Sequence, residues 1–212
     1  MTRPPPPDAV IDLYERHALA FDSDRGRALQ ERAWLDRFLA CVPPGGTVLD
    51  LGCGMAEPIG AYVVGAGRRL VGVDTSPTLV GLARARYPDH EWLVGDMRAL
   101  ALGRCFDGIL AWDSFFHLPS GDQRGMFARF AAHARSGAPL MFTSGTSAGE
   151  AIGEYQGEPL YHASLAPDDY GHLLQAHGFV VRAHVVEDPA CGCHTVWLAT
   201  RAATSHSGHD SR

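Results

Sequence analysis

Short apolar runs alternate with helical patterns along most of this chain. The apolar runs lie at residues 47–51, 70–73, 91–94, 108–112, 140–143, 180–186 and 195–199. Apolar residues at helical spacing occupy 58–64, 77–87, 121–134 and 167–177 between them, and two further helices are predicted before the first run, one from Asp8 to Asp24 and one over 27–42. Strand–helix alternation of this kind predicts a mostly parallel sheet with helices on both faces.

The last two predicted strands are too close together for a helix to join them. The segment "EDPACGCH", residues 187–194, predicts a tight turn and therefore an antiparallel last strand. The predicted fold is an α/β, Rossmann-like, doubly wound sheet of about seven strands. The motif Cys191-Gly192-Cys193-His194 offers three potential metal ligands but has no second cluster at a suitable spacing, so we predict no metal site there.

Between the first predicted strand and its helix lies the glycine turn "VLDLGCGMAEPIG", Val48 to Gly60. Dinucleotide-binding turns follow G-x-G-x-x-G, and Gly52 and Gly54 match the first two glycines. The third position is Glu57, whose carboxylate would repel a pyrophosphate at the start of the helix. A nicotinamide-dependent oxidoreductase would have to tolerate that repulsion, so a nucleoside without phosphate is favoured. An acid at a helix start is also stabilising without any ligand.

A second motif, "RLVGVDTSP", places Asp74 at the end of the next strand, roughly twenty residues after the turn. An acid at this spacing accepts hydrogen bonds from ribose hydroxyls in nucleotide-binding folds, although it could also simply cap the following helix. The formal net charge of -6 over 212 residues argues against a nucleic-acid partner. No apolar stretch approaches the length of a membrane span, and the odd count of five cysteines favours a reducing, cytoplasmic setting.

Four motifs together resemble the class I S-adenosylmethionine-dependent methyltransferases. They are "VLDLGCGMAEPIG", "VGVDTSP", "WLVGDMRAL" and "FDGILAWDSFFHL", within residues 47–118. The resemblance implies transfer of a methyl group from S-adenosylmethionine to a small-molecule acceptor, leaving S-adenosylhomocysteine. Methyltransferases of nucleic-acid bases usually carry an Asn/Asp-Pro-Pro-Tyr element that "AWDSFF" does not resemble. A protein or nucleic-acid acceptor is the alternative within this class.

The resemblance also implies roles for particular residues. Asp50, Gly52 and Gly54 would face the methionine end of the cofactor, Asp74 would hold the ribose, and Asp96 the adenine amino group. The full set of expected cofactor-binding residues is Tyr14, Arg25, Asp50, Gly52, Gly54, Asp74, Thr75, Asp96, Met97, Ala111 and Trp112. Tyr14 is expected on an N-terminal lid helix, with Arg25 as a partner for the cofactor carboxylate. Ala56 stands where the family often has glycine, and we expect helical geometry there.

On the acceptor side, His117 follows the fourth predicted strand and is the candidate general base, with Asp113 as runner-up or as its orienting partner. His117 could equally cap or pack against the next helix. Expected substrate-binding residues are Phe116, His117, Glu154, Tyr155 and Tyr161, several of them in a long loop or lid over 145–162. We expect one domain over 8–201: lid helices at 8–45, a cofactor-binding half at 46–118 and an acceptor-binding half at 119–201. Residues 1–7 and 202–212 are expected to be disordered.

Overall fold

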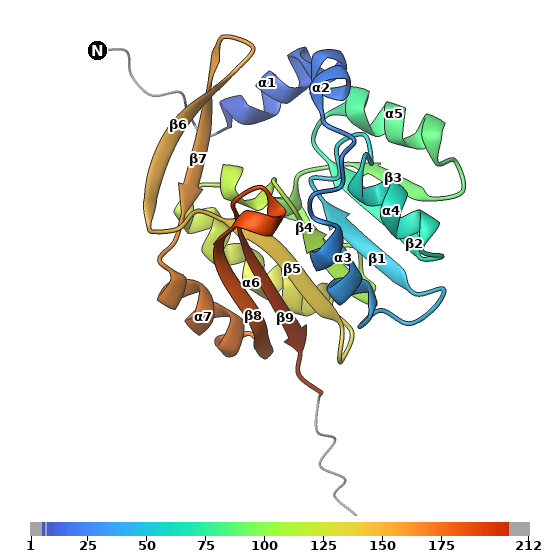
Figure 1. The fold of residues 1–212 in the computed structure, drawn as a ribbon, viewed down its shortest axis with the longest axis vertical. Coiled ribbons are helices and arrows are strands. Elements are labelled where there is room, and N and C mark those ends of the chain that lie inside the picture. Colours follow the sequence, from blue (N-terminus) through green and yellow to red (C-terminus); the bar gives the residue numbers. More distant parts are fainter. Residues whose placement is uncertain (1–5, 7, 204–212) are drawn as a thin grey trace, which may run out of the picture.

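The computed structural model describes residue 6 and residues 8–203 (Figure 1). Most of the expected leader and tail therefore lies outside the described residues. Within these bounds one seven-stranded sheet has the order β3-β2-β1-β4-β5-β9-β8. Its strands are β1 (Thr47–Leu51), β2 (Arg69–Asp74), β3 (Glu91–Val94), β4 (Gly108–Ala111), β5 (Pro139–Ser144), β8 (Phe179–Asp188) and β9 (His194–Arg201).

The directions of the strands confirm the predicted fold class. The pairs from β3 through to β5 are parallel, whereas β9 runs antiparallel to both β5 and β8. The connection from β8 to β9 is a single 3₁₀ turn, Pro189–Cys191, followed by Gly192 and Cys193 with positive φ. A connection this short can only return the chain beside the strand it has left, as the sequence predicts.

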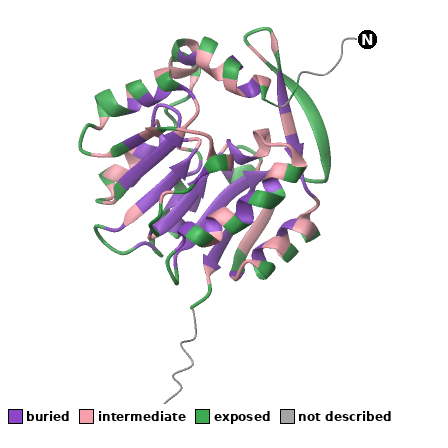
Figure 2. Cartoon of the chain, turned by 180° about the vertical axis from the view of Figure 1, so that it is seen from behind, coloured by how far each residue is buried: buried purple, intermediate pink, exposed green. Residues whose placement is uncertain are grey.

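Helices cover both faces of the sheet. The helices α3 (Arg32–Leu39), α4 (Ile59–Gly65) and α5 (Pro77–Arg86) pack on one face, and α6 (Ser120–His133) and α7 (Pro167–Ala176) on the other. Alternate residues of the central strands supply the two cores: Leu49 and Ile109 belong to one, Val48 and Leu110 to the other. Figure 2 shows the buried sheet between helices whose outer faces are exposed.

Two predicted helices differ from those in the structure: one is interrupted and the other is shorter. The helical pattern from Asp8 is interrupted at His17, which gives α1 (Ala9–Arg16) and α2 (Ala18–Asp24) in place of one helix. The helix expected over 27–42 is restricted to α3. Three short 3₁₀ segments complete the secondary structure of the described residues: η1 (Met97–Ala99), η2 (Phe115–His117) and η3 (Pro189–Cys191).

The expectation of a loop over 145–162 is wrong. Strands β6 (Gly149–Tyr155) and β7 (Glu158–Ser164) form an antiparallel hairpin that stands beside α1 (Figure 1). Its two-residue turn has Gln156 at φ 52° and Gly157 at φ 78°, the geometry that a tight hairpin favours. Leu160, Tyr161 and Ala163 pack against Val10 and Leu13 of α1. The hairpin was missed because β6 is almost entirely exposed and lacks an apolar alternation.

A buried polar network joins α6, α7 and the end of the hairpin. The Tyr170 hydroxyl donates to Gln123 Oε1 (2.6 Å) and accepts from the Leu165 backbone N–H (3.1 Å). We predict that Tyr170→Phe lowers the free energy of unfolding by about 1–3 kcal/mol, because it leaves both groups buried and unpaired. Urea unfolding measures this change. Tyr62→Phe, which removes a surface hydrogen bond to Asp36, is the control and should cost less than about 0.5 kcal/mol.

Candidate functional site

The candidate site lies at the carboxyl edge of the sheet, around the glycine turn between β1 and α4. Gly52 has φ +77°, and a Cβ placed there would lie 2.2 Å from Cβ of Ser114. The Ser114 hydroxyl in turn donates to the Leu51 carbonyl at 2.6 Å. Glycine is therefore required at 52 both for its backbone conformation and for the close approach of the segment that follows β4.

Three backbone N–H groups at the start of this turn are already hydrogen-bonded within the protein. Those of Gly52 and Cys53 donate to the Val73 carbonyl, at 2.8 and 3.2 Å. That of Gly54 donates to Asp74 Oδ2 at 2.8 Å, and the other oxygen of Asp74 accepts from the Ser76 N–H at 2.9 Å. A phosphate-binding turn must offer free N–H groups to its ligand. Here a carboxylate of the protein takes the place that a phosphate would occupy.

Two expectations about this turn need correction. Glu57 does not stand at the helix start facing an anion site: α4 begins at Ile59, and Glu57 accepts a hydrogen bond from the Tyr87 hydroxyl at 2.5 Å. Ala56 does not have helical geometry, because its φ is +67°. The turn needs a left-handed residue there, a conformation that costs an alanine roughly 1–2 kcal/mol. The frequent glycine of the family at this position has that physical reason.

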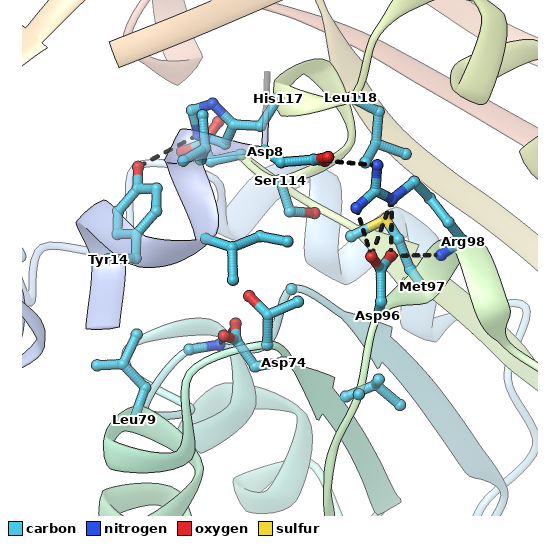
Figure 3. A pocket seen from close by; sticks show the side chains of 18 of the residues that line it. Asp8, Tyr14, Asp74, Leu79, Asp96, Met97, Arg98, Ser114, His117 and Leu118 are labelled. Atoms are coloured by element: carbon cyan, nitrogen blue, oxygen red, sulfur yellow. Dashed lines mark hydrogen bonds and ion pairs between the residues drawn. The ribbon is translucent and has the colours of Figure 1, made fainter. Parts of the chain in front are cut away.

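A first cavity lies between the turn, the end of β2 and helix α1, and includes about 810 Å³ of space, part of it open to solvent (Figure 3). Asp74, Thr75, Asp96 and Met97 line it together with Tyr14 from α1. The structure thus brings these five predicted residues together in one cleft. Their roles toward a ligand remain predictions.

Arg98 also lines the first cavity, beside Asp96, although it is not among the predicted site residues. Its guanidinium forms a bidentate ion pair with Asp96 and also reaches Asp8 at 2.7 Å (Figure 3). It lies 3.1 Å from Asp122 as well. Through these contacts the Arg98 guanidinium holds the side chain of Asp96 and that of Asp8, which directly precedes α1. An isolated arginine after "GDM" carries no sequence signal, because two of its three partners, Asp8 and Asp122, come from distant segments.

A second cavity adjoins the first and includes about 870 Å³ of space. The two share Tyr14, Phe21, Gly52, Gly54, Asp113 and His117, so they form one continuous cleft. The predicted residues Arg25, Asp50, Trp112 and Phe116 line this second part. Burial raises the pKa of the Asp50 carboxyl to about 7, and the nearby charge of Asp74 adds to the shift.

His117 bridges α1 and the hairpin. Its Nδ1 lies 2.9 Å from the Tyr161 carbonyl, and its Nε2 lies 3.2 Å from the Tyr14 hydroxyl. A carbonyl can only accept, so Nδ1 carries the proton and Nε2 accepts from Tyr14. Burial lowers the pKa of His117 to about 4, which makes the imidazole neutral in this setting.

One predicted role of Asp113 was to orient His117. In the structure the partner of Asp113 is instead His194. The Asp113 carboxylate lies 3.0 Å from His194 Nε2, and Arg25 lies 3.5 Å away on its other side. His194 Nδ1 faces the Cys191 carbonyl at 2.7 Å. Both ring nitrogens thus face acceptors, and hydrogen bonding with Asp113 raises the pKa of His194 to about 9. His194 comes from the "CGCH" motif, which the sequence analysis interpreted only as a turn.

The remaining predicted residues lie outside both cavities. Ala111 is fully buried in β4, Glu154 is exposed on the hairpin, and Tyr155 packs against the lid residues Tyr14 and Phe21. Tyr161 is buried between the hairpin and α1, and its hydroxyl donates to Glu150.

Among the described residues no group of three or more His, Cys, Asp or Glu side chains could hold a metal ion. No helix in the described part of the chain is long and apolar enough to span a membrane.

Comparison with solved structures agrees with this fold. The solved S-adenosylmethionine-dependent methyltransferase of Clostridium acetobutylicum superposes with a TM-score of 0.70 at 13% identity, over 90% of this chain and 100% of its own. An amino pentose methyltransferase of Micromonospora echinaspora, solved with S-adenosylmethionine bound, gives a TM-score of 0.67 at 18% identity, over 88% and 96% of the two chains. The architecture is that of the class I methyltransferases.

Sequence comparison identifies the family more directly. Residues 48–137 match the family described as methyltransferase domain. Trans-aconitate 2-methyltransferase of Azoarcus sp. (strain BH72) is 33% identical over 129 residues, which are 59% of this chain and 48% of that protein. The chain thus spans about half the length of this relative. Residues 48–137 thus match a methyltransferase domain, and the predicted resemblance to the class I S-adenosylmethionine-dependent methyltransferases is confirmed.

The paired His194 generates a prediction about pH. Because the pKa of His194 is raised above its unfolded value of about 6.5, the Asp113–His194 pair contributes full stability below that pH. The contribution is lost as the pH rises through about 9. We expect the thermal unfolding midpoint of the wild type, relative to His194→Gln, to decline over this interval. Parallel midpoint curves for the two proteins would contradict the assignment.

Proposed function

We propose that this protein transfers a methyl group from S-adenosylmethionine to a small-molecule acceptor. The observation that carries the proposal is the glycine turn, in which the N–H groups of Gly52 and Cys53 donate to Val73 and that of Gly54 donates to the Asp74 carboxylate. Such a turn suits a nucleoside without phosphates. The relatives support the acceptor class: one is named for trans-aconitate, and one solved neighbour for an amino pentose.

The residues of the cleft fit S-adenosylmethionine in charge as well as in shape. The ligand carries a sulfonium and an ammonium, and the cleft presents the buried carboxyls of Asp50 and Asp74. Asp50 would hold the ammonium, because among the described residues no side chain is hydrogen-bonded to it. Asp74 retains free lone pairs beside its two N–H bonds and would accept from the ribose hydroxyls. Met97 and Leu79 would contact the adenine ring.

When bound, S-adenosylmethionine supplies a methyl group activated by positively charged sulfur. The chain itself supplies orientation and exclusion of water, the main requirements of an in-line displacement. Tyr14 and Phe21 close the cleft from the lid helices where its two parts meet. Asp96, held by Arg98, would bind at the adenine end, and Trp112, at the end of β4, would border the reacting centre.

Other functions have less support. A nicotinamide-dependent oxidoreductase needs a pyrophosphate site, and the N–H groups of Gly52, Cys53 and Gly54 already have acceptors within the protein. The net charge of -6 disfavours a nucleic-acid acceptor. A cytoplasmic location is part of the proposal; the five cysteines, all unpaired, support it.

Calorimetry with S-adenosylhomocysteine tests the proposal directly. We expect saturable heat at micromolar ligand and none with NADH under the same conditions. Binding of NADH with no response to S-adenosylhomocysteine would replace the methyltransferase by the oxidoreductase.

Asp74→Ala should weaken S-adenosylhomocysteine binding by about 1–3 kcal/mol, because it removes the acceptor of the ribose hydroxyls and loosens the turn. Asp89→Ala, at an exposed acid in the loop after α5, is the matched control and should bind normally. Circular dichroism checks that both variants are folded. Wild-type affinity in a folded Asp74→Ala protein is the result that would remove Asp74 from the site.

A further inference from the structure

The acceptor part of the cleft contains two neighbouring imidazoles, and only one of them has a free nitrogen. His117 uses Nδ1 for the Tyr161 carbonyl and Nε2 for the Tyr14 hydroxyl. The lone pair on Nε2 of His117 therefore accepts from Tyr14 and is not directed at a substrate. The same two bonds connect η2 to α1 and to β7, three segments far apart in the sequence. His117 has the contacts of a residue that positions the lid.

His162, the residue after Tyr161 on β7, differs from His117 in the hydrogen bonds of its ring. It lines the second cavity, with its ring centroid 4.8 Å from that of His117 and 5.3 Å from that of Phe116. No side chain among the described residues is hydrogen-bonded to its ring. Burial lowers the pKa of His162, against smaller opposing contributions from the Leu160 carbonyl and Asp113. The ring is thus neutral and keeps an available lone pair.

The hairpin is shaped to accommodate this ring. A Cβ placed on Gly153 of β6 would lie 3.2 Å from Cε1 and 3.5 Å from Nδ1 of His162. The imidazole therefore lies against bare backbone, in space that a side chain at 153 would narrow. Gly153 has no need of glycine for its own backbone, since its φ is not positive. Its lack of a side chain leaves room for the ring.

The other ionisable groups of the second cavity are engaged elsewhere. Asp113 and His194 pair with each other, and His194 directs its second nitrogen at the Cys191 carbonyl. Glu57 accepts from Tyr87. Asp50 lies at the glycine turn, where it is assigned to the cofactor ammonium. Among the described residues of this cavity, His162 is the base that faces the aromatic acceptor side.

We propose that His162, presented by the β6–β7 hairpin, takes the proton of the methyl acceptor, and that His117 is the positioning residue that joins lid and hairpin. The proposal rests on the proposed methyltransferase function and adds the acceptor class: a protic nucleophile, an amine or a hydroxyl. The acceptor nitrogen or oxygen bonds to the methyl carbon, the electron pair of the carbon–sulfur bond stays on sulfur, and the acceptor proton passes to His162. A carboxylate acceptor would need no such base.

Chemical labelling distinguishes the two imidazoles without knowledge of the acceptor. Diethylpyrocarbonate acylates unprotonated, accessible imidazole nitrogens, and peptide mass spectrometry locates the product. At neutral pH, with S-adenosylhomocysteine bound, we expect His162 to react about tenfold faster than His117 or His194. Equal labelling of His117, or an inert His162, would overturn the assignment. The same labelling in ligand-free protein gives an answer even if the methyltransferase proposal fails.

Two matched variants separate positioning from proton transfer. His117→Gln should accelerate amide hydrogen exchange in α1 and speed S-adenosylhomocysteine dissociation about tenfold, the effect of one lost hydrogen bond. His162→Gln should leave both quantities unchanged. The reverse pattern would contradict the proposal. Gly153→Ala, which crowds His162 only, should lower its labelling rate and leave α1 exchange as in the wild type.

Turnover tests the acceptor class with three probes: an amino sugar, a phenol and a tricarboxylate. We expect methylation of an amine or hydroxyl, a lower kcat in His162→Gln with little change in KM, and loss of the rise in kcat with pH that a titrating base produces. Methylation of the tricarboxylate alone, or a wild-type kcat in His162→Gln, would exclude His162 as the base.

Discussion

The hydrogen bond from the Gly54 backbone N–H to the Asp74 carboxylate is the interaction on which the site depends. It joins the end of β2 to the turn that follows β1, over 2.8 Å, and places the carboxylate where phosphate-binding folds hold their ligand. Burial raises the pKa of Asp74, while backbone N–H donors from Gly54, Thr75 and Ser76 oppose the rise. The same side chain therefore shapes the turn and defines the class of nucleoside that fits it.

The cleft is covered by segments that meet only in the folded protein. Helix α1 packs its apolar residues against β7, and its polar residues reach the cofactor half: Glu15 bonds to Ser76 and Thr78, and Asp8 pairs with Arg98. The hairpin follows β5, yet it supports a helix from the beginning of the chain. Tyr14 of α1 lines both parts of the cleft.

Three histidines in one cleft differ in protonation because their partners differ. His194 faces a carboxylate and a carbonyl, both acceptors, and its pKa is raised to about 9. His117 faces a carbonyl and a hydroxyl that donates, and burial lowers its pKa to about 4. His162 has no side-chain partner among the described residues. A protonated His194 and a neutral His117 can therefore lie in the same cleft at the same pH.

The sequence by itself determined the sheet, its antiparallel end and the glycine turn, because these follow from local periodicity and from turns with few conformations. It also placed Asp74 at the sheet edge, since an acid at the end of a strand has a fixed place there; Asp50 was predicted from the family resemblance alone. Only the tertiary structure decided the partners of His117 and Asp113, the place of His194, and the hairpin that presents His162. Those contacts join residues about 40 to 100 positions apart, and no periodicity records which distant side chains become neighbours.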